Sequence, residues 1–78
     1  PEAKRSFSVR RLGKGRYEVR IVQPDFIGLL SVLTGLFASN GIGIENGKIE
    51  TLKKTAKDVF RVQSRTLPDW KQLESDLN

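Results

Sequence analysis

The chain has 78 residues, and its 14 lysines and arginines against 9 aspartates and glutamates give a formal net charge of +5. A chain of this length forms one small domain, because it buries only about 60% of its unfolded surface and cannot divide into two cores. It contains no cysteine and no histidine, which excludes disulfides and removes the commonest general base and zinc ligand. We therefore expect one non-catalytic domain over residues 1–78, with no metal and no cofactor.

The longest apolar stretch covers residues 26–38, is interrupted by small and polar residues, and is shorter than the roughly 20 residues that a bilayer span needs. No secretory signal is recognisable near the N-terminus. We therefore expect a cytoplasmic protein without membrane contact. Because the chain begins at Pro1, we also expect it to be a fragment of a longer protein.

Two strands open the chain. Ser6 to Leu12 and Arg16 to Gln23 are strand-like runs, joined by Gly13-Lys14-Gly15, a link typical of a hairpin with a bulge. In the second run apolar side chains occupy every other position from Tyr17 to Ile21, which predicts an antiparallel sheet with one apolar face.

A helix is expected next. Pro24 cannot donate a hydrogen bond to a strand ladder and Asp25 is a good N-cap, so the strand should end and a helix begin within about two residues. Its apolar side chains form a broad stripe of Ile27, Leu29, Leu30, Val32, Leu33, Leu36 and Phe37. A stripe this wide needs cover from a second helix or a second subunit.

The second half of the chain predicts two strands and a helix. Asn40-Gly41 ends the first helix through a left-handed C-cap, and residues 42–51 follow as a strand. Residues 53–57 form a polar turn before a strand over 58–64, and Pro68 marks the start of a final helix. That helix is expected to align Leu67, Trp70, Leu73 and Leu77 on its apolar side.

In the order and spacing of its motifs, the chain resembles the ACT domain, a ferredoxin-like regulatory module that binds amino acids and similar small molecules and commonly pairs side by side. The likeness covers about residues 16–64. It rests on Asp25-Phe26-Ile27-Gly28-Leu29-Leu30, Thr34-Gly35-Leu36-Phe37-Ala38, Gly41-Ile42-Gly43-Ile44, Asn46-Gly47-Lys48-Ile49-Glu50-Thr51 and Asp58-Val59-Phe60-Arg61-Val62. Within the family the chain looks most like the modules at the end of the uridylyltransferase that modifies the PII protein.

The expected fold is an α+β ferredoxin-like sandwich, a four-stranded antiparallel sheet with two helices on one face. The family order is strand, helix, strand, strand, helix, strand, whereas this chain has the order ββαββα and ends at Asn78. We therefore predict that the N-terminal strand takes the place of the usual last strand, at the sheet edge.

The residues point to a binding site at the turn before the first helix. Backbone amides of Gly28, Leu29 and Leu30 suit a ligand carboxylate, and Asp25 either orders the amino group of the ligand or caps the helix. Gly28 equally suits close packing of helix on sheet. The expected ligand-binding residues are Asp25, Phe26, Ile27, Gly28, Leu29, Leu30, Gly43, Asn46 and Lys48, with the last two near a dimer seam.

Three functions are compatible with these residues. The first is a regulatory domain whose partners are a small-molecule effector, expected to be an amino acid, a second copy in a homodimer, and an attached enzyme domain. The second is a dimerisation module that has lost its ligand, which Gly43 favours because amino-acid-binding members often carry asparagine there; Ile27 also replaces a usual proline. The third, a basic nucleic-acid-binding domain, is not expected, because Tyr17 and Phe60 face the core and cannot stack on bases.

Overall fold

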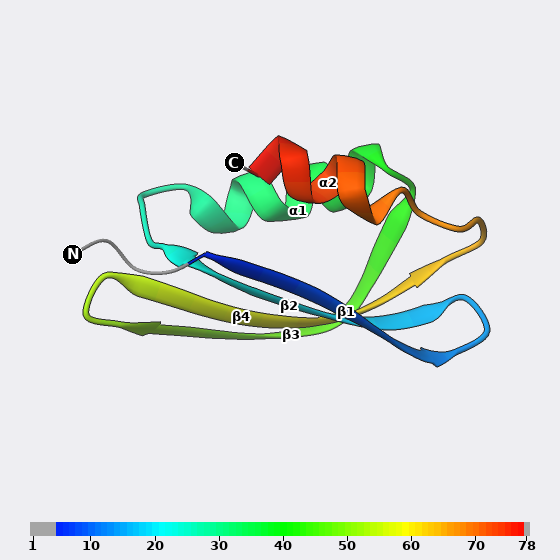
Figure 1. The fold of residues 1–78 in the computed structure, drawn as a ribbon, viewed down its shortest axis with the longest axis horizontal. Helices are drawn as coiled ribbons and strands as arrows, with labels where there is room; N and C mark the ends of the chain where they lie inside the picture. Colours follow the sequence, from blue (N-terminus) through cyan, green and yellow to red (C-terminus); the bar gives the residue numbers. More distant parts are fainter. Residues whose placement is uncertain (1–4, 78) are drawn as a thin grey trace.

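The computed structural model describes residues 5–77. This part of the chain forms β1 (Ser6–Gly13), β2 (Arg16–Pro24), α1 (Leu29–Ser39), β3 (Ile42–Leu52), β4 (Thr55–Ser64) and α2 (Trp70–Leu77). The strands make one antiparallel sheet in the order β1-β2-β4-β3, and both helices lie on one face of it (Figure 1). The α+β ferredoxin-like fold and the ββαββα order are confirmed, with β1 at the edge beside β2 as predicted.

The core lies between the sheet and the helices, because the central strands β2 and β4 alternate buried and outward-facing residues. Val19 and Phe60 are partners in register and both are buried. Phe37 of α1 packs edge-on against Phe60, with ring centroids 5.3 Å apart. Tyr17 and Trp70 of α2 make a similar contact at 5.2 Å. Each helix is thus attached to a central strand by an aromatic pair.

The hairpin between β3 and β4 is tighter than its sequence indicates. Leu52 pairs with Thr55, which leaves a loop of Lys53 and Lys54, both with positive φ (50° and 66°). Such a two-residue turn matches the twist of the strands that it joins. β4 therefore begins before Asp58, and the predicted polar turn over residues 53–57 is wrong in length.

The hairpin between β1 and β2 has the predicted bulge, a shift of register between Arg11 and Gly13. In the same hairpin Gly15 has a φ of 70°, and its carbonyl accepts a hydrogen bond of 2.8 Å from the Ser64 amide. A Cβ at Gly15 would lie 2.7 Å from the Ser64 carbonyl oxygen. Glycine therefore allows the end of β4 to approach this hairpin closely.

Helix α1 begins later than predicted. Its N-cap residue is Gly28, in the left-handed conformation with a φ of 88°, and no side chain caps the helix. A capping role for Asp25 is therefore wrong. The residues that α1 buries are Leu29, Leu33 and Phe37. All three belong to the predicted stripe, so the buried stripe is narrower than the predicted one.

Four apolar residues predicted for the helical stripes are exposed instead. Ile27, Leu30 and Val32 lie at or near the start of α1, and Leu67 precedes α2. Helix α2 begins only after Asp69, whose Oδ1 accepts a hydrogen bond of 3.1 Å from the Gln72 amide, as an N-cap side chain does. In residues 5–77 neither helix has the length and apolar character to cross a bilayer.

Candidate functional site: a hollow beneath the turn before α1

A hollow of about 340 Å³ lies between the turn that precedes α1 and residues of β3 and β4. We call it the turn hollow. Its lining residues are Asp25, Phe26, Gly28, Leu29, Leu30, Ser31, Ile49, Thr51, Ala56 and Asp58. The turn predicted from the sequence therefore does border a cavity, and most of its residues contribute to the wall.

A long-range hydrogen bond holds the turn in place. The Asp25 amide donates to the Lys54 carbonyl at 2.7 Å, which ties the end of β2 to the β3–β4 hairpin. Gly28 then reverses the chain in a left-handed conformation. A Cβ at Gly28 would meet no other atom within 4 Å, so only its φ calls for glycine. The turn leads directly into the first turn of α1.

Two backbone donors at the start of α1 remain unpaired. The Leu29 amide donates to the Phe26 carbonyl at 3.1 Å, so this predicted ligand donor is already used. The amides of Leu30 and Ser31 donate no hydrogen bond to any residue of the described part of the chain. Together with the partial positive charge of a helix N-terminus, they suit an anion. Ser31 was missed from the sequence because the helix was expected to start earlier.

On the opposite wall of the hollow is a buried carboxylate. Asp58 pairs in register with Ile21 of β2 and Ile49 of β3, on the side of the sheet that the helices cover, and is only 3% exposed. Its Oδ1 is the one buried side-chain oxygen or nitrogen in residues 5–77 without a hydrogen-bond partner. Burial raises the pKa of Asp58, as does the nearby carboxylate of Asp25, while the Glu50 backbone amide opposes them.

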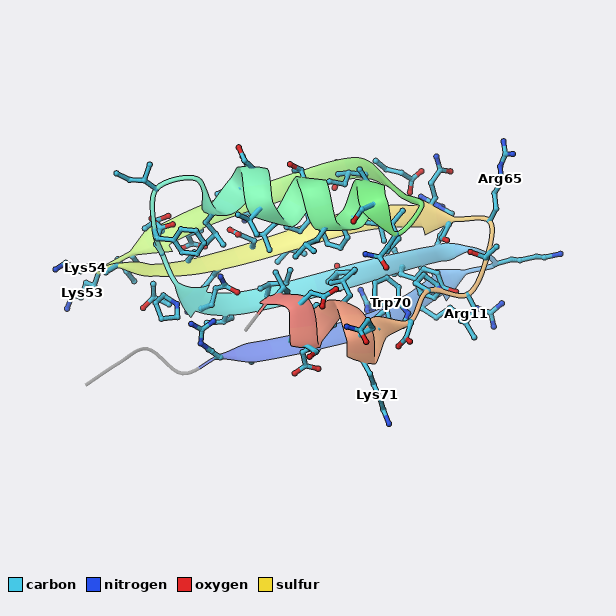
Figure 2. The ribbon with its side chains drawn as sticks, turned by 90° about the horizontal axis from the view of Figure 1, so that it is seen from above. Arg11, Lys53, Lys54, Arg65, Trp70 and Lys71 are labelled. Carbon is cyan, nitrogen blue, oxygen red and sulfur yellow. The ribbon has the colours of Figure 1, made fainter. Side chains whose placement is uncertain are left out.

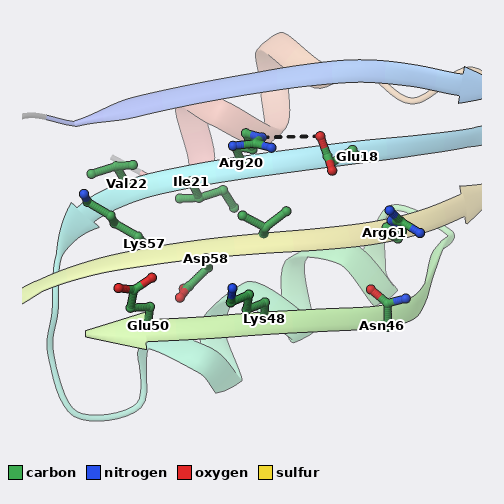
Figure 3. A pocket seen from close by; sticks show the side chains of 11 residues that line it. Glu18, Arg20, Ile21, Val22, Asn46, Lys48, Glu50, Lys57, Asp58 and Arg61 are labelled. Atoms are coloured by element: carbon green, nitrogen blue, oxygen red, sulfur yellow. Dashed lines mark hydrogen bonds and ion pairs between the residues drawn. The ribbon is translucent and has the colours of Figure 1, made fainter. Parts of the chain in front are cut away.

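The remaining predicted residues lie elsewhere in the same subunit. Asn46 and Lys48 face the sheet surface without helices, where they line a groove of about 500 Å³ (Figure 3). Gly43 lies near the other end of β3, opposite Gln63. Ile27 is fully exposed at the tip of the turn. One subunit therefore does not bring the whole predicted set into a single cavity.

Asp58 also contributes to the lining of the larger groove, but the buried carboxylate that points to the open sheet face is paired. This carboxylate, Glu18, accepts a hydrogen bond of 3.3 Å from Arg20 Nε (Figure 3). It accepts a second one of 3.0 Å from Arg10 Nη2. Burial alone would raise the pKa of Glu18, but the hydrogen bonds and charges of the two arginines outweigh it, and the pKa is lowered. The turn hollow is thus the stronger candidate, although it is the smaller of the two.

No protein family model, curated protein or solved structure matches the chain. Within residues 5–77 no group of three or more acidic side chains is placed to hold a metal ion. The indications of function in the turn hollow are its own donors, its charges and its position in the fold.

Proposed function

We propose that the chain is a non-catalytic regulatory domain of the ACT type, which binds a small carboxylate-bearing molecule in the turn hollow and controls an attached enzyme in the cytoplasm. The observation that carries the proposal is the pair of unpaired amides, Leu30 and Ser31, beside an open hollow. Such donors suit the carboxylate of a small molecule.

The hollow needs a second wall to bind its ligand tightly. A charge at an exposed helix terminus contributes about 0.3–1 kcal/mol, whereas micromolar affinity requires about 8 kcal/mol. β3 forms one edge of the sheet, spans 11 residues and is exposed at every residue except Ile42. An edge strand of this length is a template for pairing with another strand. A second copy of the chain along β3 is therefore the proposed wall.

An antiparallel pairing of two β3 edges has a useful geometric consequence. If the two-fold axis passes near Gly47, the part of the partner's β3 that contains Gly43 comes beside the part that contains Thr51, with the register shifted by the bulge between Ile44 and Asn46. Thr51 lines the turn hollow. The dimer would thus bring together the two parts of the predicted site that one subunit keeps apart.

The alternative in the same architecture is a dimerisation module without a ligand, which the glycine at position 43 favours. Nucleic-acid binding is less well supported. The open sheet face carries Arg10, Arg20 and Arg61, but the described aromatic residues lie in the core, on the helix side or at the turn. Single-stranded RNA is usually held by aromatic stacking on such a face.

Titration with the twenty amino acids, followed by backbone amide NMR, separates ligand sensing from dimerisation alone. We expect saturable shifts at Gly28, Leu30 and Ser31. Ser31→Pro deletes one donor at a position in the first helical turn that tolerates proline, and Ser31→Ala is the matched control that keeps the amide. Loss of binding in the first variant alone supports the proposal; a flat response to all twenty amino acids contradicts it.

Sedimentation equilibrium tests the dimer. Ile44→Lys places a charge on the proposed seam and should give monomers, because lysine on an edge strand opposes strand pairing. Leu67→Lys is the control, since Leu67 is exposed away from β3. A wild-type chain that stays monomeric at high concentration would refute the seam.

A further inference from the structure

We propose that the open face of the sheet docks an acidic amphipathic α-helix of a partner protein, laid along β4. The docking surface is the groove of about 500 Å³ in Figure 3, which we call the open-face groove. The proposed ligand lies on the other side of the sheet and the proposed dimer seam lies at its edge. The inference therefore goes beyond the proposed function and does not depend on it.

Cations from three strands surround the open-face groove. Those that line it are exposed, and they are Arg20 of β2, Lys48 of β3, and Lys57 and Arg61 of β4. Within residues 5–77 only Arg20 among them forms an ion pair, with a Glu18 carboxylate that it shares with Arg10. The other acids of the lining are Glu50, which is exposed, and Asp58, whose side chain faces the core. The groove thus has a surplus of positive charge that an acidic partner would neutralise.

An apolar floor lies between these cations. Val59 of β4 is partly buried and pairs in register with Arg20 on one side and with Lys48 on the other. Lys57 and Arg61 lie two residues before and after it, on the same face of the strand. Val59 is therefore the centre of a diamond of four cations, and a partner that fits it needs an apolar group surrounded by acids.

The dimensions of this diamond match an α-helix. Arg20 and Lys48 are two strand spacings apart, about 10 Å, which is about the diameter of a helix with its side chains. Lys57 and Arg61 each lie about 7 Å along the strand from Val59, and residues four apart on a helix are separated by about 6 Å. A helix with an apolar residue on Val59 therefore places acidic residues against Lys57 and Arg61. A nucleic-acid strand would meet the same cations, but none of the lining residues is aromatic and can stack on a base.

The probe for this surface is a synthetic alanine-rich helix of about 20 residues, with leucine and glutamate alternating at successive turns along one face. In amide NMR titrations at low salt we expect saturable shifts at Lys48, Val59 and Arg61, and an affinity that falls as salt is added. Lys48→Glu should weaken binding at least about tenfold, because like charges then meet across the interface. The matched control is Lys71→Glu, which makes the same change of net charge on α2, where Lys71 points into solvent (Figure 2). It should bind the peptide as the wild type does.

A second peptide of the same composition, with its leucines and glutamates on opposite faces of the helix, separates a fitted helix from general attraction between charges. It should bind more weakly than the first. Equal binding of the two peptides, equal losses in Lys48→Glu and Lys71→Glu, or shifts confined to α1 and α2 would overturn the proposal. A single-stranded oligonucleotide of equal charge that binds the groove more tightly than the first peptide would also overturn it, and would assign the face to nucleic acid.

Discussion

Replacing Asp58 by asparagine should stabilise the ligand-free domain at neutral pH. The wild-type carboxylate is 3% exposed and its Oδ1 has no partner, and an unsatisfied buried polar group costs about 1–3 kcal/mol, or more when it is charged. Asparagine has nearly the same shape but no charge, and it still buries an amide. We therefore expect the lower end of that range, an increase in the free energy of unfolding of about 1 kcal/mol.

That free energy corresponds to a measurable change in melting temperature. At about 2.1 cal/mol/K of unfolding entropy per residue, 1 kcal/mol shifts the midpoint of a domain of 78 residues by about 6 °C. Thermal and urea unfolding at pH 7, followed by circular dichroism, measure the difference. Because dimerisation and ligands also stabilise a fold, wild type and variant must be compared at equal protein concentration without amino acids.

The pH dependence distinguishes the charge of Asp58 from a simple packing effect. Burial and the Asp25 carboxylate raise the pKa of Asp58 in the fold, so the folded state holds this proton more tightly than the unfolded chain. Wild-type stability then falls as the pH rises from the ordinary aspartate pKa of about 3.9 to the raised value. The free energy of unfolding of Asp58→Asn should exceed that of the wild type by a constant amount at pH values above this range, and the difference should be near zero below it. A variant no more stable than the wild type at pH 7, or equally favoured at pH 3, refutes this reasoning.

Two further predictions concern β3 and the open sheet face. Gly47→Ala should destabilise the fold by about 1–3 kcal/mol in urea unfolding, because its Cβ would lie 2.8 Å from the ring of Phe60. Gly43→Ala should be neutral or slightly stabilising, because its Cβ would lie 3.5 Å from its nearest neighbour. Equal losses of stability in the two variants would show that the Phe60 ring moves freely. Glu18→Gln should destabilise the fold at pH values above the ordinary glutamate pKa. The lowered pKa of Glu18 stabilises the folded wild type in that range, and this stability is lost as the pH falls through the lowered value. A loss of stability in Glu18→Gln that persists unchanged at acid pH, in the same melting assay, would contradict the prediction.

The sequence predicts the order of elements and the sheet because its signals there are local. Alternation from Tyr17 to Ile21 sets the buried face of β2, and the glycines of the first hairpin set its bulge. The place of β1 beside β2 follows from the same hairpin. These features depend on neighbours along the chain, so they can be read without knowing the fold.

The start of α1 could not be predicted, because a distant contact determines it. Asp25 resembles an N-cap, yet its amide is bound to the Lys54 carbonyl, and the chain needs three more residues to turn at Gly28. Because α1 begins later than predicted, its unpaired backbone donors include the amide of Ser31 and exclude that of Leu29. The burial of Asp58, in contrast, had a signal: it precedes Phe60 and Val62 in a strict alternation, which places it on the core face of β4.

The ligand and the dimer are expected to act on one equilibrium. The hollow is lined by Ile49 and Thr51 of the edge strand β3. A ligand that contacts both subunits of the proposed dimer binds the dimer more tightly than the monomer, and by linkage it must strengthen the dimer by the same factor. The apparent affinity for an amino acid that shifts the amides of Leu30 and Ser31 should therefore rise with protein concentration across the dimer dissociation range. Only such a difference in affinity between two arrangements can change the activity of an attached enzyme. An affinity for that amino acid that is independent of protein concentration, in a chain that does dimerise, would place the complete site within a single subunit and remove the dimer seam from the mechanism.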